Sequence, residues 1–124
     1  MDFTLDQEQQ GIVDAVTTLL DRLAGPERAR ATGVAGHDDA LLHSLAEAGF
    51  LDLATEPTIG PLGAVLVAEL ASHHHARANV AVRTLVGSML LGTDAPARLA
   101  VMDASRPGPV RFGQHADAVL ILDG

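Results

Sequence analysis

Apolar and polar positions recur with a helical period over much of the first 91 residues. The first such segment has polar residues mainly off its apolar stripe. The stripe consists of Ile12, Val13, Val16, Leu19, Leu20 and Leu23. Thr4 followed by Gln7 is typical of a capping box, and Gly25-Pro26 is a stop signal. We therefore predict a helix between these signals. Residues 26–37 contain two glycines and have weak periodicity, so we predict a loop there with one helical turn.

A second helix is predicted from Asp38, as the N-cap residue, through Ala48. Its apolar face consists of Leu41, Leu42 and Leu45. Gly49 stands where a left-handed residue commonly ends a helix, and Phe50 can then fold back onto Leu45, as in a Schellman motif. We expect residues 51–53 to continue as an extended segment, followed by a turn over residues 55–61.

The stretch from Gly60 to Gly92 predicts two further helices. Pro61 suits a first helical position, where its missing N–H is no loss. The first of these helices has an apolar stripe of Leu62, Val65, Leu66 and Leu70. Residues 80–91 are apolar on almost every face, which is typical of a helix surrounded by protein, so we expect this helix to be central. An apolar run of about a dozen residues is too short to cross a bilayer, and Arg83 interrupts it.

Past Gly92 the chain changes character, with three prolines and two short β-type runs. These runs are residues 110–112 and 118–122. Asp123-Gly124 is a turn signal with no second strand after it, so we expect the last strand to pair outside this sequence or the chain to be cut here. The predicted fold is mainly α: an antiparallel helical bundle over residues 1–92, then a Pro/Gly-rich linker and the start of a β region over residues 93–124.

Composition narrows the functional classes. The chain of 124 residues is 48% hydrophobic and carries a net charge of −8, which makes nucleic-acid binding an unfavourable interpretation. It has no Cys, so a disulfide framework, a zinc ribbon and a thiol nucleophile are excluded. All its basic residues are Arg, a bias typical of GC-rich bacterial genes. The acidic start is unlike a signal peptide, and we expect a cytoplasmic protein with no membrane association.

Histidines and carboxylates offer two candidate polar sites. His73, His74 and His75 invite a metal interpretation, but successive helical residues point about 100° apart and cannot all face one ion. The favoured alternative is that these imidazoles interact with the last carbonyls of a helix. His43 and Glu47 are four residues apart, which predicts a surface pair in preference to a ligand set. We assign no catalytic, cofactor-binding or metal-binding residue.

Two charged residues lie beside or inside apolar stretches. Glu69 is next to the third apolar stripe; it could act as a general base, but capping or pairing with an arginine such as Arg77 or Arg83 is the favoured interpretation. Arg83 interrupts the most apolar helix, where a buried Arg needs a partner, and it could face another subunit. Arg83 and Glu69 are therefore the candidate interface residues.

Four segments, in the same order, resemble the acyl-CoA dehydrogenase family. Residues 2–9 are similar to the family's opening, residues 45–53 to its Leu-Ala-Glu-x-Gly-Leu-Leu-Gly-Leu segment, residues 66–71 to a helix ending in Glu-Glu-Leu-Gly, and residues 116–122 to a strand of its middle β-domain. The resemblance implies the N-terminal helical domain of such a flavoprotein. The chain also resembles the degenerate subunits of bacterial two-gene dehydrogenases, which act in steroid and fatty-acyl breakdown.

The departures from the family pattern matter equally. The Pro-Glu-Glu-x-Gly-Gly turn is replaced by residues 54–60, only residues 93–115 occupy the place of the flavin-contacting segments, and the C-terminal four-helix bundle that usually supplies the catalytic Glu is absent. The resemblance thus implies α,β-dehydrogenation of an acyl-CoA with FAD held outside this chain, by a further domain or subunit that shares the acyl-CoA pocket. The alternative is a non-catalytic helical module that docks on a complete dehydrogenase subunit and stabilises it.

Overall fold

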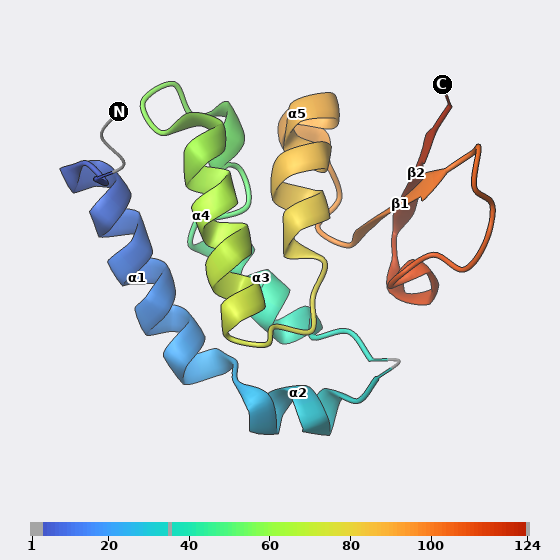
Figure 1. Ribbon diagram of the computed structural model, residues 1–124, viewed down its shortest axis with the longest axis horizontal. Coiled ribbons are helices and arrows are strands. Elements are labelled where there is room, and N and C mark those ends of the chain that lie inside the picture. The colour runs from blue at the N-terminus through green and yellow to red at the C-terminus, as the bar shows by residue number, and fades with distance from the viewer. Residues whose placement is uncertain (1–3, 35, 124) are drawn as a thin grey trace.

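The computed structural model describes residues 4–34 and 36–123, and it is mainly helical with a small sheet near the C-terminus (Figure 1). Residues 2–3 of the family-like opening and Gly124 of the turn signal lie outside this description. The main elements are α1 (Gln7–Leu23), α2 (Pro26–Thr32), α3 (Asp39–Glu47), α4 (Gly60–His73), a π-helical segment (Val82–Gly87), α5 (Ser88–Leu91), β1 (Leu99–Asp103) and β2 (Ala118–Leu122).

Helix α1 has the predicted apolar stripe but a different cap. The prediction that Thr4 caps this helix is wrong, because Asp6 is the N-cap residue. Its carboxylate accepts the Gln9 N–H at 2.7 Å, and the Gln9 side chain accepts the Asp6 N–H at 3.0 Å, so the capping box is built two residues further along the chain. The stripe is confirmed, with Ile12, Val16 and Leu20 buried.

The predicted loop over residues 26–37 contains more helix than expected. Helix α2 occupies Pro26–Thr32 with Pro26 in its first turn, where the missing N–H costs nothing, although none of its residues is buried. Helix α3 follows as predicted, because the Asp38 carboxylate accepts the Leu41 N–H at 3.1 Å. The Schellman motif is also confirmed: Gly49 has φ +82°, and the Phe50 N–H donates to the Leu45 carbonyl at 3.0 Å.

Residues 51–53 are not extended, and this prediction is wrong. They form a turn that leads into a short 3₁₀ helix, Leu53–Thr55, with the Glu56 N–H donating to the Leu53 carbonyl. Leu51 and Leu53 are both buried in the core. The turn therefore places both apolar side chains in the core.

Helix α4 presents small residues to the core rather than the predicted stripe. Its buried residues are Gly63, Ala64, Val67, Ala68 and Ala71. The predicted stripe is wrong, because its first two members are exposed and its last two are only half-buried. Gly63 leaves room for the residue that precedes the helix, because a Cβ at position 63 would lie only 2.2 Å from a methyl carbon of the N-cap residue Ile59.

The helix over residues 80–91 is not enclosed on all faces as its sequence predicts. It contains the π-helical segment and α5, and its buried residues include Arg83, Thr84 and Ser88. Met89 and Leu90 are 62% and 61% exposed. The prediction of a helix enclosed on all sides is therefore wrong: its polar residues point inward and part of its apolar surface points outward.

The C-terminal region forms a two-stranded parallel sheet of β1 and β2. The register pairs Leu99 with Ala118 and Asp103 with Leu122. The strand over residues 118–122 is confirmed, but the expectation that it lacks a partner in this sequence is wrong, because β1 supplies one. Residues 110–112 are not a strand, since Phe112 has φ +59° and the chain turns there into a short 3₁₀ helix, Gly113–His115.

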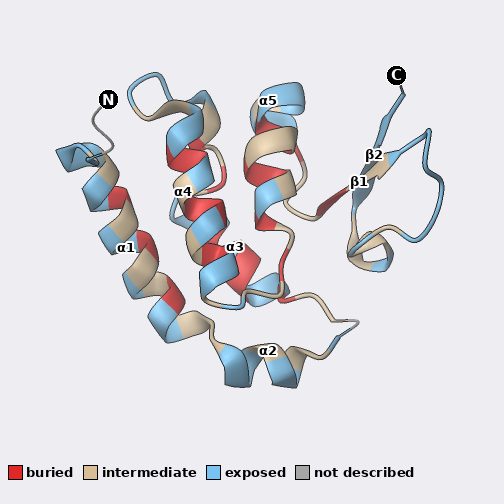
Figure 2. Ribbon diagram, viewed as in Figure 1, coloured by how far each residue is buried: buried red, intermediate tan, exposed pale blue. Residues whose placement is uncertain are grey.

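The hydrophobic core lies between α1, α3 and α4 and the segments that connect them (Figure 2). It consists of Ile12, Val16, Leu20, Leu41, Leu42, Leu45, Leu51, Leu53, Val67, Ala71, Ala78 and Val80. Figure 1 shows α1 and α4 side by side and running in the same direction, whereas helix 80–91 runs back along α4. Within the described residues, no helix combines the length and the apolar character needed to cross a membrane.

Candidate functional site

Arg83 is the centre of a buried polar network on the inner side of helix 80–91. Its guanidinium donates to the Leu51 carbonyl at 3.2 Å, to the Ser88 hydroxyl at 2.8 Å and to the Asp52 carboxylate at 2.9 Å. The Ser88 hydroxyl also donates to the Leu51 carbonyl at 2.9 Å. The network thus joins helix 80–91 to the turn after α3 through side chains and one carbonyl.

The π-helical turn has a simple relation to this network. Arg83 and Ser88 are five residues apart, and both lie on the buried side of the wider helical turn that contains them. Such turns are frequent at functional sites, and here the turn places a cation and a hydroxyl together against Leu51. Arg83 pairs with a carboxylate of the same chain, that of Asp52. Its predicted interface role therefore stays a prediction, and its buried position gives that prediction no support.

An exposed apolar surface is the second feature of the helical part. We use the name apolar face for the exposed apolar side chains of the neighbouring helices α4 and 80–91, namely Leu62, Val65, Met89, Leu90 and Leu91. Strand β2 adds further exposed apolar side chains, namely Val119, Ile121 and Leu122. Large exposed apolar patches are typical of interaction sites, and these side chains are the candidates for one.

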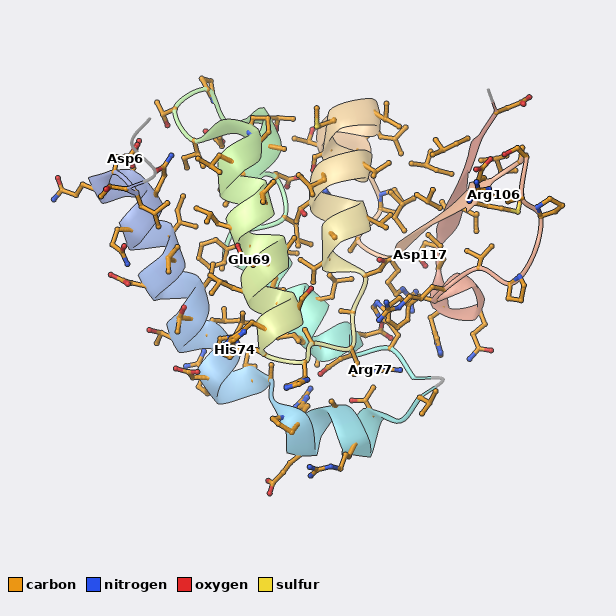
Figure 3. The ribbon with its side chains drawn as sticks, in the orientation of Figure 1. Asp6, Glu69, His74, Arg77, Arg106 and Asp117 are labelled. Atoms are coloured by element: carbon orange, nitrogen blue, oxygen red, sulfur yellow. The ribbon has the colours of Figure 1, made fainter. Side chains whose placement is uncertain are left out.

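Glu69 lies in the C-terminal half of α4 (Figure 3). It is exposed, and within the described residues no hydrogen bond or ion pair joins it to Arg77 or Arg83. The predicted pairing of Glu69 with either arginine is therefore wrong. Since the side chain points to solvent on the helix that carries Leu62 and Val65, its predicted interface role stays open.

The three consecutive histidines do not converge. His74 interacts with the Leu70 carbonyl at 2.9 Å through Nδ1, and its Nε2 lies 3.0 Å from the Asp21 carboxylate of α1 (Figure 3). The predicted contact between an imidazole and a late helix carbonyl is confirmed for His74. His75 follows in a left-handed conformation, with φ +58°, and turns the chain away. Within the described residues, no cluster of three His, Asp or Glu side chains has the arrangement of a metal site.

The remaining predicted pair, His43 and Glu47, is a surface contact as expected. Their side chains are 3.3 Å apart, and both are about 70% exposed. Such a contact between solvated groups adds little to stability.

Two further arginine–aspartate pairs join segments that are distant in the sequence. Arg28 forks onto the Asp38 carboxylate at 2.7 and 2.8 Å, and this hydrogen bonding holds the pKa of Asp38 below its ordinary value against the opposing effect of burial. Arg98 forks onto Asp117 at 2.7 and 3.2 Å and lowers the pKa of that carboxyl in the same way. The first pair joins α2 to the start of α3, and the second closes the base of the small sheet.

Sequence reasoning missed Asp52 as the partner of Arg83 and Arg98 as the partner of Asp117. The paired residues are separated by 31 and 19 positions, so no local spacing marks either pair. A comparison of the chain with models of known protein families, with curated proteins and with solved structures finds no match. The resemblance to acyl-CoA dehydrogenases therefore rests on the four segments quoted above.

Proposed function

We propose that this chain is the non-catalytic helical part of a cytoplasmic acyl-CoA dehydrogenase-like flavoprotein assembly, in which a further domain or subunit covers its apolar face. The proposal combines the four family-like segments with the surface of helices α4 and 80–91. In this proposal the covering domain or subunit holds the flavin and the catalytic carboxylate. This chain forms one wall of the acyl-CoA pocket.

The observation that carries the proposal is the orientation of helix 80–91. Met89 and Leu90 are more than half exposed, while Arg83 and Ser88 of the same helix are buried and hydrogen-bonded. Leaving large apolar side chains in water costs about 1.5–3 kcal/mol each relative to full burial. A covering surface would recover this free energy, which supports an obligate neighbour rather than a free-standing chain.

The alternative function is a separate helical module that docks on a complete dehydrogenase subunit and stabilises it. The same apolar face supports both candidate functions, a domain of the enzyme and a separate docking module. Reading the gene past the codon for Gly124 distinguishes them: a continuing frame that supplies flavin contacts and a carboxylate base would make this chain one domain of the enzyme. A stop codon would favour the separate module.

The proposal predicts that the 124-residue chain alone neither retains FAD nor oxidises an acyl-CoA. The measurement is a titration of the purified chain with FAD, followed by flavin absorbance after gel filtration, with a complete acyl-CoA dehydrogenase as the positive control. One FAD retained per chain would contradict the proposal, because the flavin site would then lie within these residues.

A further inference from the structure

Two adjoining cavities lie where the loop between α2 and α3 meets the loop before β2. The first has a volume of about 290 Å³ and the second about 360 Å³, and Val34 and Arg77 line both. The first is also lined by Val110, Arg111, Phe112, Gly113 and Gln114. The second is also lined by Ala29, Arg30 and Gly33.

The lining of these cavities carries only positive charge. Arg30, Arg77 and Arg111 contribute to it, and no carboxylate appears among the described residues that line either cavity. The chain as a whole has 16 acidic residues against 8 arginines. A positive concave surface on such an acidic chain favours an anionic ligand locally.

Arg77 is held in place without its charge being neutralised. One terminal nitrogen donates to the carbonyl oxygens of Gly33 and Val34, and the Arg77 carbonyl accepts the Asp38 N–H at 2.7 Å. Its Nε is buried and has no hydrogen-bond partner among the described residues. Arg28, Arg83 and Arg98 each face an aspartate, whereas in the part of the chain that the structure describes no carboxylate pairs with Arg77.

Arg111 is presented by a strained turn. Phe112 has φ +59°, a left-handed conformation that is uncommon for a bulky residue. The Phe112 ring is fixed by an edge contact with the His37 ring at 5.2 Å, and the Arg111 guanidinium lies 5.0 Å from the centre of the same ring. The aromatic contacts thus position the second arginine of the first cavity.

We propose that the cavity lined by Arg77 and Arg111 binds a small molecule that carries an oxyanion, a phosphate or a carboxylate, on a short apolar body. Guanidinium groups bind both oxyanions through paired hydrogen bonds. Val110 and Phe112 provide the apolar wall, and the volume is near the lower end of the range for small-molecule sites. This site is separate from the apolar face and does not depend on the proposed dehydrogenase function.

The test is isothermal titration calorimetry of the full chain with phenyl phosphate, benzoate and uncharged benzyl alcohol. We expect one molecule of phenyl phosphate or benzoate to bind per chain, with an affinity that falls as salt is added, and benzyl alcohol to bind far more weakly. The oxyanion that binds more tightly identifies the class of the natural ligand. Failure of both anions to bind, or equal binding of benzyl alcohol, would overturn the proposal.

Variants separate the site from general charge effects. Arg111→Gln is expected to weaken anion binding by about tenfold, because one charge-assisted pair of hydrogen bonds is lost. Arg106→Gln is the matched control: it removes the same charge from an exposed residue well away from Arg77 (Figure 3) and should leave the affinity unchanged. Both variants should keep the thermal unfolding profile of the natural chain, and equal affinities of the two would overturn the proposal.

Discussion

Replacing Asp52 by alanine is expected to lower the free energy of unfolding by about 3 kcal/mol, because it leaves a buried guanidinium without a counter-charge. The Arg83 side chain is only 5% exposed, whereas that of Asp52 is 41% exposed. Removing the carboxylate therefore leaves a mostly buried charge with only the Leu51 carbonyl and the Ser88 hydroxyl as neutral acceptors among the described residues. Urea denaturation followed by circular dichroism measures the loss.

The complementary variant, Arg83→Met, should cost less, about 1–2 kcal/mol. The Asp52 carboxylate can be hydrated once its partner is gone, and the Leu51 carbonyl keeps the Ser88 hydroxyl as a donor. The double variant Arg83→Met with Asp52→Ala should be close in stability to Arg83→Met alone, since no buried charge remains. A larger loss for Arg83→Met than for Asp52→Ala would contradict this description of the network.

Truncating Leu45 to alanine is expected to cost about 3–4 kcal/mol, because this side chain is fully buried at the contact between α3 and the core. In contrast, Met89→Gln and Leu90→Gln should change the free energy of unfolding by no more than about 0.5 kcal/mol, since both side chains are mostly exposed. The same denaturation experiment measures all three variants.

The comparison tests which side of helix 80–91 faces the protein. If Leu90→Gln were as destabilising as Leu45→Ala, the helix would be enclosed, as its apolar sequence alone predicts. Melting curves of Met89→Gln and Leu90→Gln that match the natural chain would instead place both residues on a surface that the isolated chain leaves open.

Local signals predicted helices α1 and α3 well. The apolar stripe of α1 and the Asp38 cap with the Gly49 turn of α3 each depend on residues within a few positions of one another, so period and capping chemistry are sufficient. The displaced cap of α1 shows the limit of such signals, because Thr4 and Asp6 are both good caps and each has a Gln three residues later.

Features that depend on distant residues could not be predicted from the sequence. The inward side of helix 80–91 is set by Arg83 and its contact with Asp52, which lies 31 residues away, and average hydropathy contains no information about that pairing. The buried residues of α4 are mostly small and give a weak hydropathy signal, whereas its larger side chains suggested the opposite face. Strand β1 lacks a local β signal as clear as that of β2, with which it pairs in parallel.

The cavity arginines illustrate the same limit for function. Arg77 and Arg111 are far apart in the sequence and belong to no recognisable motif, yet they line one cavity. No spacing rule connects them, because the turn at Phe112 and its ring contact with His37 bring them together.

The measurement that tests the proposed assembly most directly is the rate at which hydrogen peroxide oxidises Met89, read by mass spectrometry. Met89 is 62% exposed in the isolated chain, and the half-buried Met102 serves as the internal reference. We predict that Met89 reacts rapidly in the purified 124-residue chain and several-fold more slowly in the protein as isolated from its own cells, where the covering domain or subunit is present. Equal rates of Met89 oxidation in the two preparations would contradict the claim that a neighbour covers the apolar face.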